Sequence, residues 1–178
     1  MLNIIAGTLS VGVTPSTTSY ESIATTTLGT TASSVTFSSI PATYTHLQIR
    51  YSLTAAAPAD TTIRFNGDTG ANYSAHLLRG TGTAAQSLAY ASQTASYVQF
   101  NIGFDTSVAV IDVLDYVNTN KNKTIRSLAG WDSNSNGNID FWSGAWYNTG
   151  AITSLVLTAV TTTFSVNSKF ALYGIKGA

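Results

Sequence analysis

The chain has no cysteine and very little charge, and each shortage removes a class of protein from consideration. Without cysteine there can be no disulfide framework, no thiolate zinc site and no thiol nucleophile. Eight basic and eight acidic residues make up 9% of the chain and give a formal net charge of zero. A surface that follows phosphates needs clustered lysine and arginine. Because the basic residues here are scattered singly, we expect no nucleic acid partner.

Long apolar runs and helical patterns are also missing. No stretch approaches the ~20 apolar residues of a membrane-spanning helix, and the best candidate, residues 108–117, is interrupted by Asp112 and Asp115. The short apolar stretch at the N-terminus has no basic region before it, so we expect neither a secretion signal nor a membrane partner. No window of eleven or more residues has the apolar spacing of a helix, which predicts a domain with essentially no helix.

Serine and threonine are abundant instead, at 49 of the 178 residues. Their hydroxyls compete for backbone hydrogen bonds, so they favour strands and turns over helix interiors. Threonine, valine, isoleucine, tyrosine and phenylalanine dominate the remaining half-apolar positions, and these residues fit a pleated, half-buried surface. A chain of this length is expected to form one domain whose core needs no disulfide or structural metal.

Apolar and polar residues alternate with a period of two throughout the chain. In residues 45–53, Leu47, Ile49, Tyr51 and Leu53 share one face of an expected strand. Comparable runs are 23–28, 34–40, 62–66, 73–78, 87–91, 97–102, 108–117, 124–129, 139–147, 152–160 and 170–175. Glycine and asparagine turns separate these runs. The sequence therefore predicts a single antiparallel β-sandwich, jelly-roll-like, with an extended N-terminal arm.

The N-terminal region differs from the rest, and we divide the chain into an arm and linker (1–19) and a β-sandwich domain (20–178). The arm carries the apolar side chains of Leu2, Ile4 and Ile5, followed by a linker rich in glycine, serine and threonine. Two interpretations remain open. The arm could be an extra edge strand of its own sheet, or a strand added to a partner. Leu2, Ile4 and Ile5 are therefore the candidate partner-binding residues.

A second group of candidates is aromatic. Trp131, Trp142, Trp146 and Tyr147 follow one another closely, and the expected strand over residues 139–147 carries large apolar groups on both faces. Such a strand needs cover on both sides. Because aromatic residues are enriched at oligomer interfaces, we favour a subunit interface here. The alternative is a platform on which sugar rings stack.

The segment 132–140 matches the opening of a calcium loop, with oxygen ligands at its first, third and fifth positions and glycine at its sixth. The twelfth position, which ordinarily supplies a bidentate glutamate, is Ser143, and a strand rather than a helix follows. A polar hairpin tip is therefore favoured, and weak calcium binding stays open.

Catalytic patterns are absent as well. His46 and His76 have no second histidine or carboxylate at a ligating spacing, and no nucleophile elbow is present. Asp112 and Asp115 are three positions apart, so on one strand they point to opposite faces and cannot serve as a glycosidase pair. We expect no enzyme activity, no catalytic residues, no cofactor and no dedicated metal site.

Three segments carry more specific patterns: I-P-x-T-Y-T-x-L within 39–50, R-F-N-G-D-x-G-x-N-Y-S within 63–74, and L-Y-G-I-K within 170–176. Taken together and in this order, they resemble a family of virion structural proteins encoded by tailed bacteriophages, especially phages of marine bacteria and cyanobacteria. The resemblance extends from about Tyr20 to the C-terminus.

The resemblance implies a β-sandwich on the outer surface of a phage particle, made in the host cytoplasm and without catalytic residues. Family members include tail-fibre parts and capsid-associated proteins. Because no residues are left for a fibre shaft, we favour a capsid cement or decoration protein that binds the major capsid protein and stabilises the lattice. It would act as a homo-oligomer, with a trimer expected. The alternative is a small tail or fibre-tip protein that binds host-surface glycans.

Overall fold

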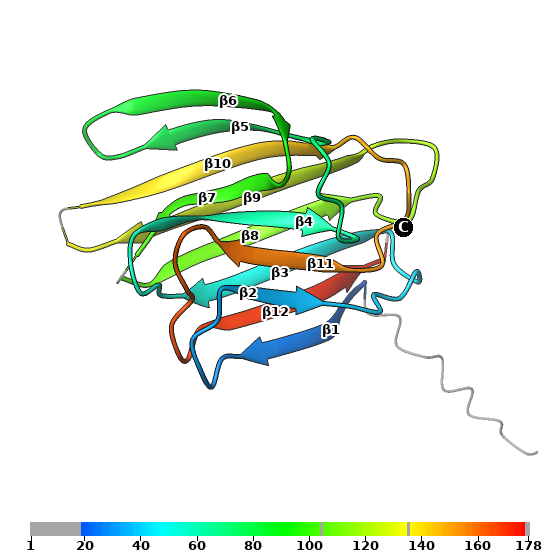
Figure 1. Ribbon diagram of the computed structural model, residues 1–178, viewed down its shortest axis with the longest axis horizontal. Helices are drawn as coiled ribbons and strands as arrows, with labels where there is room; N and C mark the ends of the chain where they lie inside the picture. The colour runs from blue at the N-terminus through cyan, green and yellow to red at the C-terminus, as the bar shows by residue number, and fades with distance from the viewer. Residues whose placement is uncertain (1–18, 104, 135, 177–178) are drawn as a thin grey trace, which may run out of the picture.

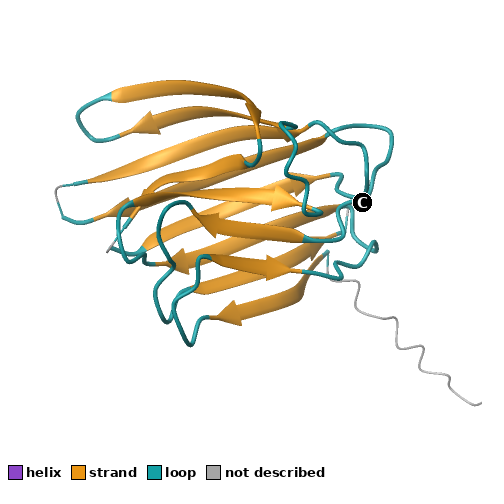
Figure 2. Ribbon diagram, viewed as in Figure 1, coloured by secondary structure: helices purple, strands orange, loops and turns teal. Residues whose placement is uncertain are grey.

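The computed structural model describes residues 19–103, 105–134 and 136–176, and within them the chain forms twelve β-strands and no helix, hence none that could cross a membrane (Figures 1 and 2). The strands are β1 (Tyr20–Thr27), β2 (Ser34–Phe37), β3 (His46–Leu53), β4 (Ala59–Phe65), β5 (Tyr73–Gly80), β6 (Ala85–Gln93), β7 (Ser96–Ile102), β8 (Ser107–Leu114), β9 (Lys123–Asp132), β10 (Gly137–Trp146), β11 (Leu155–Ala159) and β12 (Lys169–Ile175). Each overlaps one of the runs of alternating residues, so the all-β expectation is confirmed.

The strands form two antiparallel sheets that pack face to face as a β-sandwich. The large sheet has eight strands in the order β1-β12-β3-β8-β9-β10-β5-β6, and the small sheet has four in the order β2-β11-β4-β7. In Figure 1 the large sheet runs from β6 at the top to β1 at the bottom, with the small sheet across its nearer side. One face of the large sheet is therefore covered, and the other is turned to solvent. The jelly-roll topology stays a prediction.

Pairing at the centre of the large sheet is regular and places alternate side chains on opposite faces. β9 and β10 pair without a shift, from Lys123 opposite Trp146 to Asp132 opposite Gly137. Along β9 the side chains alternate between buried and exposed over most of the strand. This is the period of two that the sequence shows, now assigned to an inner face and a solvent face.

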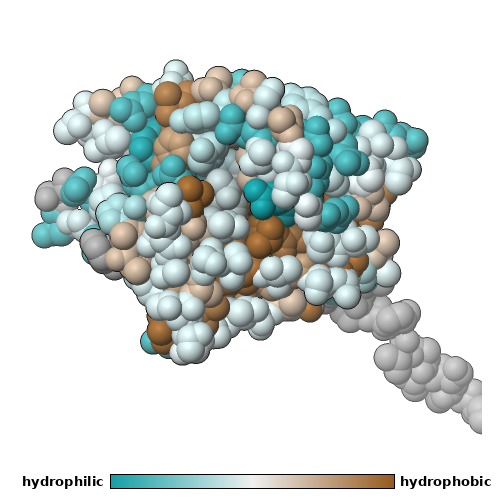
Figure 3. All heavy atoms as spheres, in the orientation of Figure 1, coloured by the Kyte–Doolittle hydropathy of each residue, from teal (hydrophilic) through white to brown (hydrophobic). Residues whose placement is uncertain are grey.

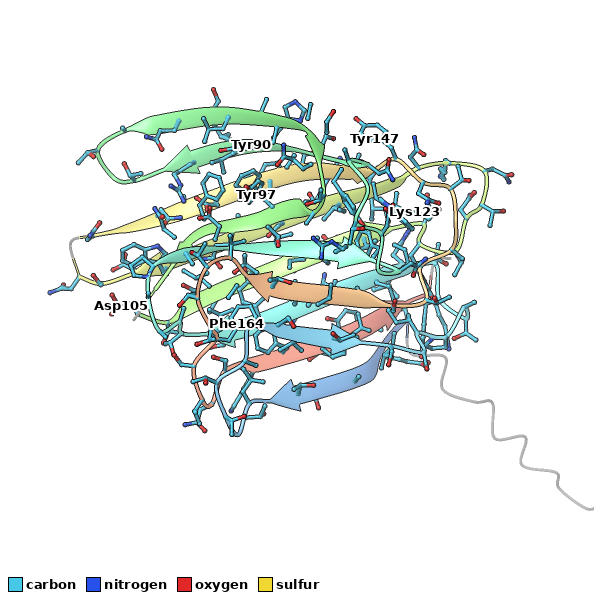
Figure 4. All side chains as sticks on the ribbon, in the orientation of Figure 1. Tyr90, Tyr97, Asp105, Lys123, Tyr147 and Phe164 are labelled. Atoms are coloured by element: carbon cyan, nitrogen blue, oxygen red, sulfur yellow. The ribbon has the colours of Figure 1, made fainter. Side chains whose placement is uncertain are left out.

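The space between the sheets holds a large apolar cluster and a smaller one. Fully buried members of the large cluster include Leu47, Ile49, Ile63, Phe65, Val98, Ile111, Val113, Leu157, Phe164 and Leu172. The smaller cluster is centred on Trp142, with Tyr90, Tyr97 and Phe100 packed against it. Figure 4 shows Tyr90 and Tyr97 close together, and their ring centroids are 4.9 Å apart. Burial of these side chains supplies the main driving force for folding.

The pattern within residues 63–74 builds the corner at which the chain passes from β4 in the small sheet to β5 in the large sheet. Asn66 and Gly67 both have positive φ, 51° and 67°, which turns the backbone sharply. The carboxylate of Asp68 then accepts a hydrogen bond of 2.7 Å from the indole N–H of Trp146. This contact ties the corner to the end of β10.

Further contacts hold the same corner. The side-chain oxygen of Asn66 accepts from the backbone amides of Thr153, at 2.9 Å, and Ser154, at 3.1 Å. The hydroxyl of Tyr73 accepts from the amide of Phe65 at 3.0 Å. The residues of this pattern are therefore occupied in joining the two sheets.

The first and last patterns meet at the β1 edge of the large sheet. The ring of Tyr44 packs against Gly174, where an added Cβ would lie 2.3 Å from the ring carbons. The ammonium of Lys176 lies 5.9 Å from the centroid of the Tyr44 ring and 2.7 Å from a carboxylate oxygen of Glu21. Only glycine at position 174 admits the ring, so the two patterns depend on each other sterically.

Among the described residues, three charged side chains are buried in the sandwich, those of Arg79, Asp140 and Lys123. Asp140 is fully buried and binds Arg79 at both ends of its carboxylate, at 2.7 and 3.1 Å. The same carboxylate accepts from the backbone amide of Phe100 at 2.8 Å, which joins β10 to β7. Charge-assisted bidentate pairs of this kind are strong and geometrically specific. The pair fixes how the two sheets meet beside the Trp142 cluster.

The third buried charge is the ammonium of Lys123, labelled in Figure 4. Its Nζ donates to three backbone carbonyl oxygens, those of Asn118, Lys121 and Thr149. Desolvation by burial lowers the pKa of this ammonium below its ordinary value. The residue joins the loop after β8 to the loop after β10, so it has a structural role.

Candidate partner-binding face

The face of the large sheet turned away from the small sheet, here called the open face, carries a continuous apolar patch. One row of cross-strand neighbours places Val110, Leu128, Phe141 and Leu78 side by side on β8, β9, β10 and β5. The adjacent row contains Val108 and Ile139. These six side chains are between 37% and 60% exposed. Single exposed apolar residues are ordinary, whereas a contiguous group of six marks an interaction surface.

A groove of about 980 Å³ lies within the patch. In the row that holds Val108 and Ile139, the positions on β9 and β5 are Gly130 and Gly80, which have no side chains. Gly130 leaves the backbone of β9 open between Val108 and Ile139, and Gly80 leaves the backbone of β5 open beyond Ile139. Asp132 at the end of β9 and loop residues, among them Thr81, Thr106 and Asn136, complete the lining. The groove thus combines aliphatic side chains with hydroxyl, amide and backbone groups.

The next row on the open face is polar and separates the groove from the opposite end of the sheet. It contains Gln48, Asp112, Arg126 and His76 on β3, β8, β9 and β5. The side-chain amide of Gln48 donates to Asp112 at 2.8 Å. An apolar partner would therefore meet a defined polar border on this side of the patch.

A cluster of aromatic and charged side chains lies at the β1 edge of the same face. The rings of Tyr20 and Tyr173 stack with centroids 4.8 Å apart, and the guanidinium of Arg50 lies over both. Burial raises the pKa of the Tyr20 hydroxyl, while the nearby Arg50 charge lowers it in part. The Tyr20 hydroxyl donates to Gln48 at 2.8 Å. These groups are satisfied among themselves.

Figure 3 shows the other side of the molecule, where the small sheet faces the viewer. Hydrophobic residues there form separate areas among neutral and hydrophilic ones. The apolar residues that remain exposed outside the patch are dispersed. Leu88 lies on β6 and Val166 in the loop before β12, and they are 43% and 44% exposed.

The tryptophans are placed differently from our expectation. Trp142 and Trp146 are only 1% exposed and pack in the interior, so they can contact neither another subunit nor a glycan. Both lie on the inner face of β10, opposite the face that carries Phe141. Trp131 is partly buried beside the groove. Tyr147 is 57% exposed, and its hydroxyl accepts from Ser74 at 3.2 Å.

Of the other candidates from the sequence, some lie within the described residues and some do not. Leu2, Ile4 and Ile5 lie outside the described residues. In the calcium-like segment, Asp132 accepts from the amide of Asn134, whereas Asp140 is the buried partner of Arg79. Among the described residues no group of three or more histidine, aspartate or glutamate side chains could hold a metal ion.

The patch residues on β8, β9 and β5 were not predicted as a site, although the sequence contained a signal for them. Apolar residues occupy both alternations of residues 108–114, which predicts cover on both faces, as was argued only for residues 139–147. The same argument applied to β8 would have pointed to Val108 and Val110. Which strands lie beside it depends on the sheet order, which the alternation does not contain.

No family model matches the chain, and neither a curated protein nor a solved structure matches it.

Proposed function

We propose that this chain is a bacteriophage virion structural protein: a capsid cement or decoration protein that binds the outside of the capsid lattice and associates with copies of itself, as a trimer. The observation that supports this proposal most directly is the open face of the large sheet. Its six clustered apolar side chains lie on an otherwise complete sandwich, and the chain has few charges with which to keep such a face in water.

The architecture supports the same proposal. The buried charges of Arg79, Asp140 and Lys123 are all used within the sandwich. On the patch, the groups that remain for an external partner are apolar side chains, with the hydroxyls, the amides, Arg50 and Asp132 of the groove around them. Such a surface binds protein by excluding water from apolar area, as subunit contacts do.

The alternative, a tail or fibre-tip protein that binds host glycans, has less support. It requires exposed aromatic rings on which sugars stack, and two of the three indoles that suggested it are buried. The stacked rings of Tyr20 and Tyr173 cover each other and lie under Arg50. A glycan array with the purified chain tests this alternative directly.

The copy number of the chain in purified virions tests the proposal. A capsid protein follows the lattice symmetry and should occur in on the order of hundreds of copies, whereas a tail protein should occur in about a dozen or fewer. The lower number would refute the proposal. A second test measures binding of the purified chain to empty capsids at increasing salt. Apolar contacts are not screened by ions, so binding should persist at about 1 M salt, where surface ion pairs are largely screened.

Matched variants connect the binding to the open face. Val110→Thr with Leu128→Thr removes apolar area from the patch and keeps residues that favour strands. Leu88→Thr with Val166→Thr removes similar area elsewhere. Burial of one such side chain contributes about 1.5–3 kcal/mol, so the first pair should weaken capsid binding by more than about tenfold. The second pair should leave it unchanged. Equal effects of both pairs would show that capsid binding does not depend on the open face.

A further inference from the structure

The open face also indicates which partner fills the groove. We infer that the groove beside Val108 and Ile139 is the docking site for the N-terminal aliphatic segment, residues 2–13, of a second copy of this chain. This inference rests on the proposed self-association and deepens it. It differs from the strand-addition mechanism because the receptor is a sheet face rather than a sheet edge.

The chemistry of the segment complements that of the groove. No charged residue occurs before Glu21, and Leu2, Ile4, Ile5, Leu9, Val11 and Val13 are large aliphatic residues. Alternation of Leu9, Val11 and Val13 with small residues places these side chains on one side of an extended segment. The groove offers aliphatic side chains, and its loop residues offer hydroxyl and amide groups to an extended backbone. The charged residues in the lining, Arg50 and Asp132, have opposite signs, so the groove has no net charge that would favour a charged peptide.

The offsets across and along the strands place the groove about 28 Å from the start of β1, so distance alone allows docking by the same chain or by a second copy. Tyr20, at the start of β1, lies at the far edge of the large sheet, with β12, β3 and β8 between it and β9. Four inter-strand spacings separate β1 from β9, about 19 Å. Along the strands, β1 begins level with residue 114 of β8, six residues from Val108. That offset adds about 20 Å.

A segment folding back on its own chain would have to cross the cluster of Tyr20, Gln48 and Arg50, whose groups are already hydrogen-bonded to one another. A segment that leaves the β1 edge toward a neighbour meets no such obstacle. Residues 6–18 can extend about 43 Å at most, so the crossing of this cluster, and not the distance, favours the second copy.

The arrangement also accounts for a closed assembly. The segment leaves one corner of the sheet, and the groove lies toward the opposite corner, so each copy would donate at one side and accept at the other. A head-to-tail contact of this kind is heterologous, and it forms a ring when the rotation between successive copies closes. A trimeric ring uses every segment and every groove and leaves none of them open.

Disulfide trapping tests the inference, because the chain has no cysteine of its own. An Ile4→Cys protein, extended by a tag so that its mass differs, is mixed with a Val108→Cys or an Ile139→Cys protein in a glutathione buffer. Non-reducing electrophoresis should show a covalent dimer of the two different chains. Its yield should be at least about tenfold above that with Val166→Cys, a control of similar exposure outside the groove.

The double variant Ile4→Cys with Val108→Cys on one chain separates the two sources of the segment. Trapping between copies produces covalent oligomers. A disulfide that closes within single chains, together with no mixed dimer, would overturn the inference in favour of self-docking. Yields equal to the Val166→Cys control at both groove positions would also overturn it.

Light scattering provides an independent readout on chains without cysteine. Ile4→Thr with Ile5→Thr, and separately Val108→Thr with Ile139→Thr, should each weaken self-association about tenfold or more. Combining all four substitutions should cause little further loss, because both pairs remove one contact. The matched pair Leu88→Thr with Val166→Thr should leave the assembly mass unchanged. Additive losses would show that segment and groove bind different partners, which overturns the inference.

The outcomes separate this inference from the proposed function. Capsid binding without mixed disulfides would support the proposed function and refute this docking site. Mixed disulfides without capsid binding would support the docking site and refute the proposed function.

Discussion

The buried pair of Arg79 and Asp140 gives the sharpest test of how the two sheets are held together. Asp140→Asn keeps the size of the side chain and removes its charge. The carboxylate now accepts from Arg79 Nε and Nη2, from Asn138 Nδ2 and from the amide of Phe100. An asparagine side chain has one acceptor oxygen and presents an NH2 group where donors converge. The guanidinium would therefore stay buried without its counter-ion.

The magnitude follows from that uncompensated charge. Removal of one partner of a buried ion pair costs about 3–5 kcal/mol, which is a large part of the 5–15 kcal/mol that stabilises a typical domain. With a urea m-value of about 2 kcal/mol/M, the unfolding midpoint should fall by about 1.5–2.5 M. The double variant Arg79→Met with Asp140→Asn removes both charges. It should be more stable than Asp140→Asn alone, since the remaining oxygen can still accept from Phe100.

Urea unfolding followed by tryptophan fluorescence measures these changes, because Trp142 lies in the neighbouring cluster. Protein concentration is held fixed, since self-association shifts apparent stability. Asp132→Asn is the matched control: Asp132 is exposed at the end of β9, and its substitution should change stability by no more than about 0.5 kcal/mol. A midpoint shift below about 0.5 M for Asp140→Asn, or a double variant less stable than the single one, would refute the reasoning.

Three further predictions concern the corner and the β1 edge. Gly174→Ala drives a methyl group into the Tyr44 ring and should cost about 1–3 kcal/mol, whereas Gly29→Ala, with no atom within 4 Å, should be nearly neutral in the same assay. Hydrogen bonds hold the pKa of Asp68 below its usual value, so its carboxylate stabilises the fold above about pH 4 and loses this effect as pH falls. The stability gap to Asp68→Asn should shrink accordingly in acid. Burial raises the pKa of Tyr73 to about 12, so stability should fall as pH rises above about 10, and less steeply in Tyr73→Phe.

The sequence predicted the strands well because a period of two is a local property. All twelve runs of alternating residues correspond to strands, including β3, where Leu47, Ile49 and Leu53 are buried as expected. The partition into sheets of eight and four strands is not local. Eight of the strands align into one sheet only because distant segments pair, such as β1 with β12. Alternation gives a strand two faces but does not name its neighbours.

Turn signals show the same limit. Asn66 and Gly67 adopt the positive φ values that the dipeptide predicts, yet the strands on either side belong to different sheets, so the turn makes a corner. At Asn136-Gly137 a hairpin does form, but Gly137 is already part of β10, and the positive φ belongs to Asn134. Gly137 serves a close approach instead, since an added Cβ would lie 2.5 Å from the carbonyl oxygen of Trp131.

The tryptophan prediction failed for a related reason. The argument that β10 carries large apolar groups on both faces was correct, and Phe141 is exposed as that argument requires. It could not decide which face is inside the sandwich. The small sheet covers the face of Trp142 and Trp146, where the indole of Trp146 also finds Asp68. Cover from the small sheet, and not polar partners, decides the burial of this face, since the buried indole N–H of Trp142 has no hydrogen-bond partner among the described residues. That cover comes from distant segments, which the pattern of one strand does not contain.

The three patterns from which we predicted a phage virion protein have structural roles in this sandwich. The pattern around Asn66 joins the two sheets, and the patterns around Tyr44 and Gly174 lock the β1 edge. None of the six patch residues belongs to these segments. Proteins that share the patterns can therefore share the sandwich and differ in the open face. The patterns therefore account for the sandwich and not for the open face, and under the proposed function we assign partner binding to side chains of that face such as Leu128 and Ile139.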